Sequence, residues 1–263
     1  MSLTLFTACA STKNIYKKEV NERFQQPLNE TRIITNADLE QLPQLVANYL
    51  IHCGWVGEEI PQNFHLKFEG DFSLKPGKYI KIKSEQYNWF NPPTRIFYIH
   101  NWMIAGRHRY DERGAFMLIK LFGRFQVENA HGAIMDQSEL VTYLNDLCIV
   151  APGALVDAPV EWETIDDYSV KATITQFGHT ISAILYFNED WELVNFISTD
   201  RIASTDGVTG EKIPWSTPMR DYITIDRRKV PSYGEAIWHY PDGDFVYAKF
   251  DVKTVKWNVP EAQ

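Results

Sequence analysis

Positive charge is the first thing that this 263-residue sequence lacks: 26 Lys and Arg stand against 34 Asp and Glu, a formal net charge of −8. Phosphate binding needs clustered positive charge, so we expect no nucleic-acid partner. No stretch reaches the ~18 apolar residues of a membrane-spanning helix. The three cysteines are too few for a disulfide scaffold, and a hydrophobic fraction of 44% excludes disorder over most of the chain.

Recognisable catalytic motifs are also missing. The seven histidines form no H-E-x-x-H zinc pattern, and no nucleophile elbow, Walker loop or dinucleotide-binding fingerprint occurs. The glycine-containing run 206–210 lacks the lysine of a phosphate-binding loop and indicates a flexible loop. We therefore expect no cofactor, no metal and no catalytic His, Asp or Glu.

Two polar groups are the remaining candidates for chemistry. The first is a run on a predicted hairpin: His108, Arg109, Asp111 and Glu112. It forms either a polar site or the exposed charges of that hairpin. The second flanks a predicted turn: His239, Asp242 and Asp244. It is either an acid–base or metal site or ordinary turn chemistry, because Asp and Gly favour the backbone angles of turns.

The N-terminus contains a segment that resembles a bacterial lipobox. Residues 3–8 are mostly apolar, Thr7 and Ala8 are small, and Cys9 follows. In a lipobox the mature protein begins at the cysteine, which carries acyl chains that anchor it in a membrane. The segment is short for a signal peptide and lacks a basic start, so an incidental cysteine at a frayed end is the alternative. The predicted organisation is a truncated signal over 1–9, a polar tether over 10–34 and one domain over 35–259. Lipid anchorage implies the bacterial cell envelope, and an incidental cysteine implies the cytoplasm.

The other two cysteines, Cys53 and Cys148, lie among apolar residues near the ends of predicted helices. Two buried free thiols are the favoured interpretation. A disulfide between them is the alternative in an oxidising compartment.

Aromatic residues are abundant, with 8 Trp, 13 Tyr and 15 Phe, and the dominant period is that of strands. Apolar residues at helical spacing predict helices over 36–53 and 137–148, with Pro43 interrupting the first. Short alternating segments separated by turn residues fill most of the remainder and predict an antiparallel meander. The expected fold is α+β and mostly β. A large curved antiparallel sheet forms an open half-barrel with two amphipathic helices on its concave face, and long loops are expected over 123–133 and 198–215.

Several short motifs resemble a bacterial family of unknown function. They are Leu42-Pro43 with Tyr49-Leu50, Arg109-Tyr110-Asp111 with Gly114, Asp136-Gln137 with Glu139-Leu140 and Tyr143-Leu144, Pro214-Trp215, and Trp238 with the run 241–247. The family has no established reaction, so the resemblance carries no catalytic residue. The order of strands and helices is also similar to the LolA-like lipoprotein carriers, which implies an open half-barrel that holds lipid chains under helices.

The apolar sides of the predicted strands suggest where an apolar ligand would bind. The candidate ligand-binding residues are Phe68, Tyr98, Trp102, Ala183, Leu185, Trp215, Trp238 and Phe250. The favoured function is a non-enzymatic envelope lipoprotein that binds or shields an apolar small molecule such as a lipid. An enzyme with its site at the mouth of the sheet and a structural interaction module are the alternatives, and the fold can also close without a ligand.

Overall fold

The computed structural model describes residues 11–28, 30–204 and 206–263, so Cys9 and the lipobox-like segment lie outside the described residues. The helices are α1 (Thr12–Phe24), α2 (Asn36–Leu39), α3 (Gln44–His52), α4 (Ala133–Val150) and the short 3-10 helix η1 (Pro152–Val156). The strands are β1 (Asn63–Lys75), β2 (Lys78–Phe90), β3 (Pro93–His100), β4 (Ile104–Asp111), β5 (Gly114–Leu121), β6 (Phe125–His131), β7 (Val160–Asp166), β8 (Ser169–Gln176), β9 (His179–Phe187), β10 (Leu193–Ser198), β11 (Ile202–Ala203), β12 (Glu211–Lys212), β13 (Trp215–Ser216), β14 (Met219–Ile225), β15 (Arg228–Tyr240) and β16 (Gly243–Trp257).

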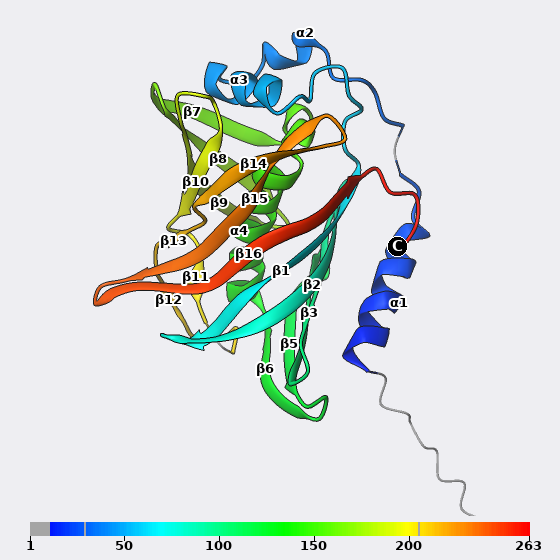
Figure 1. The fold of residues 1–263 in the computed structure, drawn as a ribbon, viewed down its shortest axis with the longest axis vertical. Coiled ribbons are helices and arrows are strands. Elements are labelled where there is room, and N and C mark those ends of the chain that lie inside the picture. The colour runs from blue at the N-terminus through cyan, green and yellow to red at the C-terminus, as the bar shows by residue number, and fades with distance from the viewer. Residues whose placement is uncertain (1–10, 29, 205) are drawn as a thin grey trace, which may run out of the picture.

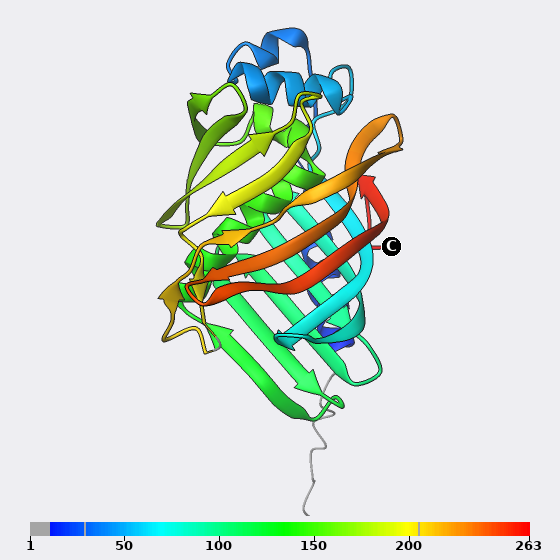
Figure 2. The same cartoon turned by 60° about the vertical axis from the view of Figure 1, so that its left-hand side comes forward.

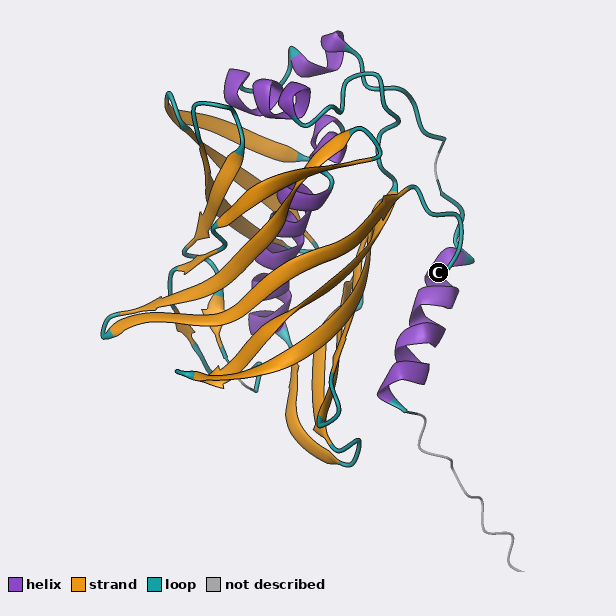
Figure 3. Cartoon of the chain, viewed as in Figure 1, coloured by secondary structure: helices purple, strands orange, loops and turns teal. Residues whose placement is uncertain are grey.

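One 14-stranded sheet dominates the structure and curls around α4 (Figures 1 and 3). Its order is β6-β5-β4-β3-β2-β1-β16-β15-β13-β10-β9-β8-β7, and β14 pairs with β15. The ladders are antiparallel, and β1 pairs with β16 from Phe64 opposite Trp257 to Phe72 opposite Ala248. The predicted curved antiparallel sheet and open half-barrel are confirmed.

Helix α4 lies on the concave side and contacts both ends of the sheet, with β5 and β6 on one side and β9 and β10 on the other (Figure 2). A sheet this wide must curl, and the helix fills the space that the curl encloses. Leu140, Leu144 and Leu147 on α4 are fully buried, together with Ala183 and Leu185 on β9. The second predicted helix therefore holds the position expected of it.

The first predicted helix is divided, as Pro43 required. Its two pieces are α2 and α3, and α3 lies at one end of the half-barrel (Figure 1). Val46, Tyr49 and Leu50 on α3 are buried in the same core as α4. Cys53 and Cys148 are buried free thiols, and burial raises the pKa of Cys53 to about 12.

Three segments differ from the sequence-based expectation. Part of the predicted tether is helix α1, which packs on the outer face of the sheet, where Tyr16 stacks on Tyr98 with 5.3 Å between ring centroids. The sequence did not predict α1 because only a narrow stripe of this helix is buried and its apolar pattern is weak. The expected loop over 123–133 contains edge strand β6, whose mostly exposed residues need no apolar alternation. The expected loop over 198–215 contains β11, β12 and the start of β13.

Candidate functional site

A cavity of about 330 Å³ lies between α4 and the concave face of the sheet and is partly open to solvent. Its wall is built largely from aromatic and aliphatic side chains: Phe68, Phe72, Phe97, Ile99, Trp215, Trp238 and Phe250. These residues face inward because successive side chains on a strand point to opposite faces of the sheet. The volume falls in the range of small-molecule sites, roughly 300–1,000 Å³.

Four of the eight predicted ligand-binding residues line this cavity: Phe68, Trp215, Trp238 and Phe250. Trp238 also stacks on Tyr247, with 6.2 Å between ring centroids, as expected for aromatic partners on adjacent strands.

The other four predicted residues do not line the cavity. Ala183 and Leu185 face inward, but α4 covers them and they belong to the filled core. Tyr98 faces outward beneath α1, because its neighbours Phe97 and Ile99 take the inward positions of β3. Trp102 is 83% exposed. The strand predicted to include it ends at His100, and a turn follows.

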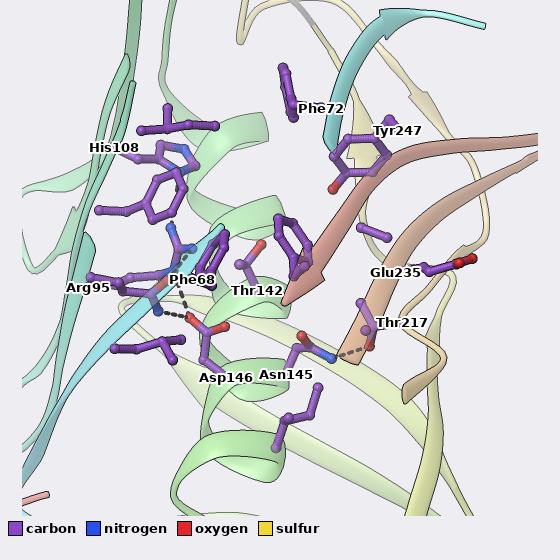
Figure 4. A pocket seen from close by; sticks show the side chains of 18 of the residues that line it. Phe68, Phe72, Arg95, His108, Thr142, Asn145, Asp146, Thr217, Glu235 and Tyr247 are labelled. Carbon is purple, nitrogen blue, oxygen red and sulfur yellow. Dashed lines mark hydrogen bonds and ion pairs between the residues drawn. The ribbon is translucent and has the colours of Figure 1, made fainter. Parts of the chain in front are cut away.

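Buried charges form one side of the cavity, and sequence reasoning missed them. Arg95 on β3 donates from Nε to Asp146 Oδ2 at 2.8 Å and from Nη2 to Gln86 Oε1 at 3.2 Å (Figure 4). Its Nη1 lies 3.5 Å from Glu139 Oε2. The side chains of Arg95 and Glu139 are 8% and 1% exposed. Asp146 and Glu139 hold the pKa of Arg95 above its usual value, although burial alone would lower it.

His108 completes this cluster in a neutral form. His108 Nδ1 lies 3.1 Å from Arg95 Nη1 and 3.3 Å from Glu139 Oε2, and the contact with Arg95 is the one with hydrogen-bond geometry. Because a guanidinium can only donate, we assign Nδ1 as the acceptor and place the proton on Nε2. Burial lowers the pKa of His108 to about 4, with Arg95 and Arg201 adding to the effect and Glu139 opposing it. Its Nε2 has no hydrogen-bond partner among the described residues.

Arg201, which also lines the cavity, approaches Glu139 and lies against two tryptophan rings of the wall. Its guanidinium lies 4.4 Å from the Trp215 ring centroid and 5.4 Å from that of Trp238. The nearest carboxylate contact joins Arg201 Nη2 and Glu139 Oε1 at 3.7 Å. Burial alone would raise the pKa of Glu139, but the neighbouring charges outweigh it and the pKa is lowered: Arg95 and Arg201 act as permanent cations, and His108 adds to the effect where it is protonated.

A signal for this cluster was present in the sequence of α4. Glu139, Thr142 and Asp146 recur at helical spacing on one side of a helix that is otherwise largely apolar, and all three line the cavity. The spacing of Asp136 and Glu139 is also that of an N-terminal capping box, which would place Glu139 at an exposed helix start. In the structure Asp136 accepts from the backbone N–H of Ala115 at 2.5 Å, and Glu139 is buried.

The first polar group suggested by the sequence is divided by the sheet. His108 faces the cavity, whereas Arg109 and Asp111 lie on the other face, where Arg109 also approaches Glu19 of α1 at 3.8 Å. Glu112 is exposed in the turn between β4 and β5. These residues therefore do not form one site.

The second polar group is partly assembled, with a different partner. His239 Nδ1 lies 2.7 Å from Asp244 Oδ1, and its Nε2 lies 2.7 Å from Ser216 Oγ. A hydroxyl, an imidazole and a carboxylate in this order are the arrangement that activates a serine nucleophile. Ser216, however, is 2% exposed and lies on the outer face, because its neighbours Trp215 and Thr217 line the cavity.

The described residues hold neither a candidate metal site nor a helix that could cross a membrane. None of them form a group of three or more His, Cys, Asp or Glu suited to hold a metal ion. None of the helices over 11–28, 30–204 and 206–263 combines the length and hydrophobicity needed to cross a membrane.

Comparisons with known proteins give a family model and distant solved structures. Residues 32–250 match the model of a family of unknown function, DUF6544. A DUF1329 family protein from Desulfovibrio piger is 11% identical with a TM-score of 0.45, over 87% of this chain and 95% of that one. A LolA superfamily protein from Nitrosomonas europaea is 12% identical with a TM-score of 0.45, over 92% of this chain and 94% of that one. No curated protein matches the chain.

Proposed function

Because the chain belongs to DUF6544, a family of unknown function, as its motifs predicted, we propose a function from its own cavity. The protein binds an amphipathic small molecule, with an apolar chain and a polar group, inside the half-barrel and does not transform it. The observation that carries this proposal is the cavity of about 330 Å³, in which an apolar wall adjoins a buried cluster of charges.

The apolar wall supports a ligand with an apolar chain. Phe68 packs edge-to-face on Phe250 with 4.6 Å between ring centroids, and Phe97 stacks on Phe68 at 6.0 Å. A hydrocarbon chain placed against these rings removes apolar surface from water on both sides, at about 25 cal/mol per Å².

The charge cluster supports a polar group that accepts hydrogen bonds. Arg95 pairs with Asp146 and Glu139, and Arg201 also approaches Glu139, so the two carboxylates of the cluster are matched by two guanidinium groups. The groups without hydrogen-bond partners among the described residues are donors, His108 Nε2 and Arg201 Nε. A buried donor without an acceptor is costly, so a carbonyl, ester or carboxylate of the ligand is the complementary group.

The test is a titration of the purified protein with a fluorescent long-chain fatty acid. Ile149 on α4 lines the cavity, and Ile149→Trp should weaken binding at least tenfold because the larger side chain occupies the space of the ligand. Ile165 on β7 is 48% exposed, and the same substitution there, Ile165→Trp, is the matched control that should leave binding unchanged. Arg201→Gln should also weaken binding of the fatty acid but leave a fatty alcohol nearly unaffected.

The proposal fails if the parent protein binds neither probe, or if Ile149→Trp and Ile165→Trp bind equally well. Thermal unfolding of each variant shows whether the fold is retained. If Ile149→Trp unfolds, Arg201→Gln still distinguishes the outcomes, because only a ligand held with its polar group near Arg201 discriminates acid from alcohol.

The enzyme alternative has one observation in its favour, the Ser216–His239–Asp244 arrangement. It requires Ser216 Oγ to become accessible, because the residue is 2% exposed. A fluorophosphonate probe tests it directly. Labelling of the parent that disappears in Ser216→Ala supports a serine hydrolase, whereas equal labelling of both supports a structural role for the three residues.

The envelope location is proposed from the sequence around Cys9. We infer that acyl chains on Cys9 hold the protein at a membrane. Cys9 lies two residues before Ser11, where the described part of the chain begins. Cells that express the gene and receive a fatty-acid probe should label the parent protein but not Cys9→Ser. Equal labelling of the two would refute acylation at this residue and leave the ligand proposal untouched.

A further inference from the structure

Two neighbouring turns at one end of the half-barrel carry large apolar side chains in solvent. Trp102, in the turn between β3 and β4, is 83% exposed, and Phe122 and Phe125, around the turn between β5 and β6, are 55% and 65% exposed. The rings of Trp102 and Phe122 are 5.9 Å apart, and the Phe122 N–H donates to the Met103 carbonyl at 2.7 Å. Single exposed apolar residues are common, but a contiguous group indicates an interaction surface.

The local structure of the turns does not account for these aromatic residues. Asn101 Oδ1 accepts from the backbone N–H groups of Met103 and Ile104 at 2.7 and 2.8 Å, so Asn101 fixes the first turn without help from Trp102. Phe122 has a φ of 49°, in the left-handed region that favours glycine. Neither burial nor turn chemistry therefore favours an aromatic residue at these positions.

The same end of the molecule is basic. Lys120 and Arg124 flank Phe122. Lys13, at the start of α1, lies close to His100, whose pKa is lowered mainly by burial and further by the charge of Lys13. Over the described ranges, none of these three cations lies within ion-pair distance of a carboxylate, whereas Lys81 and Lys83 on β2 are both paired. Unpaired cations beside exposed aromatic rings are typical of surfaces that contact anionic bilayers.

Two described parts of the molecule, the start of α1 and the cavity-lining strands β3 and β5, lie at this end. Helix α1 starts beside the two turns, at the lower end of Figure 1, and Figure 2 shows the same proximity from another side. The chain that precedes α1 holds Cys9 and the apolar residues 3–8. Ile99 and Ile119, which line the cavity, belong to the two strands that lead into the turns, so the cavity wall continues toward the exposed rings.

We propose that Trp102, Phe122 and Phe125, with Lys120 and Arg124, form a docking tip that rests on the surface of a lipid bilayer. The indole and phenyl rings enter the interfacial layer, where such rings are enriched, and the cations lie at the level of anionic headgroups. This orientation points the strands that line the cavity toward the membrane. The docking tip does not depend on a ligand in the cavity.

The experiment is flotation of the Cys9→Ser protein with vesicles, because removal of the thiol prevents acylation and residues 3–8 are the same in every variant compared. The vesicles contain either phosphatidylcholine alone or phosphatidylcholine with one-third phosphatidylglycerol. On the anionic vesicles, Trp102→Ser/Phe122→Ser/Phe125→Ser should lower the partition coefficient about 100-fold or more, because three buried rings are lost. Lys120→Ser/Arg124→Ser should lower it about 25-fold, with little effect on neutral vesicles.

The matched control is Trp191→Ser. Trp191 is 47% exposed and lies in the turn between β9 and β10, next to Glu192, whose Oε1 is 3.7 Å from His52 Nε2 of α3 at the other end of the half-barrel. This variant should float like the parent.

Two results would overturn the proposal. The first is a parent that does not float with either vesicle, or a triple variant that floats as well as the parent. The second is light scattering that shows a dimer which the triple variant converts to a monomer, without vesicle binding by the parent, because the exposed rings would then be an interface between two copies of the chain.

Discussion

Removal of Arg95 is the sharpest test of the buried charge cluster. Arg95→Leu leaves Asp146, which is 15% exposed, without its cation, and leaves Glu139, which is 1% exposed, with the more distant Arg201 in place of two guanidinium groups. Loss of one partner from a buried ion pair costs about 3–5 kcal/mol, because the remaining charge stays desolvated. At ~2–4 °C per kcal/mol for a chain of this size, the midpoint of thermal unfolding should fall by roughly 6–20 °C.

Urea unfolding at several pH values measures this effect and identifies its cause. In the parent, the lowered pKa of Glu139 stabilises the fold above its unfolded pKa, and this contribution is lost as pH falls. In Arg95→Leu the burial of Glu139 is no longer offset by Arg95, so its pKa should rise and the carboxyl should become protonated more easily. The difference in stability between parent and variant should therefore shrink as the pH falls from 7 toward 4.

The control is an arginine whose own side chain is exposed and whose carboxylate partner, Asp111, keeps a second cation, Arg109, at 3.4 Å. Arg113 is 60% exposed and its Nη2 lies 2.6 Å from Asp111 Oδ2, so Arg113→Leu should cost no more than about 1 kcal/mol. Addition of Asp146→Leu to Arg95→Leu should recover part of the loss, because it removes an uncompensated carboxylate. Equal losses for Arg95→Leu and Arg113→Leu at pH 7 would refute the description of the cluster as buried and coupled.

Three further predictions concern other parts of the molecule. Burial raises the pKa of Glu128 in the cavity wall from 4.5 to about 7. The free energy of unfolding of the parent, measured in urea, should therefore fall relative to that of Glu128→Gln as the pH rises from 4.5 to about 7. Parallel pH profiles of the two proteins would contradict this. Deletion of residues 1–24 removes α1 and should expose Tyr98 and Trp89, so the truncated protein should bind a hydrophobic dye and aggregate. A truncated protein as soluble as the parent would count against the packing of α1. Cys53→Ser/Cys148→Ser should unfold at the same midpoint with and without reductant, and so should the parent, because both thiols are free; a reductant effect on the parent alone would show a disulfide.

Most of the architecture was predictable from local patterns, because most of the longer strands have a clear alternation of apolar and polar residues. Alternation of apolar and polar residues in segments such as 64–69 and 169–176 indicates which side chains point inward. Pro43 indicated where the first helix divides. Helix α1 and strand β6 were not predictable in this way. Each buries only a narrow part of its surface, so its apolar pattern is weak.

The candidate site was only partly predictable, for a physical reason. Phe68 and Phe250 could be assigned from strand alternation, since an inward position depends on the strand alone. Whether an inward residue meets α4, as Ala183 does, or faces the cavity depends on where the helix lies across the sheet. The cluster of Arg95, Glu139 and Asp146 joins β3 to α4, and spacing within one segment does not reveal such pairs.

The pairing of β1 with β16 has a consequence for how the chain folds. Phe64 lies opposite Trp257, so the seam that joins the two halves of the sheet uses segments from near both ends of the domain. Contacts that are distant in sequence require a large loss of chain entropy before they form, and folding slows accordingly. On the ribosome, the hairpins β1 to β6 can pair as they emerge, but the sheet stays in two parts until the last strand is released. The inward faces of both parts remain open during that interval, and we expect chaperone binding and aggregation in the cell to depend on how quickly β16 reaches β1.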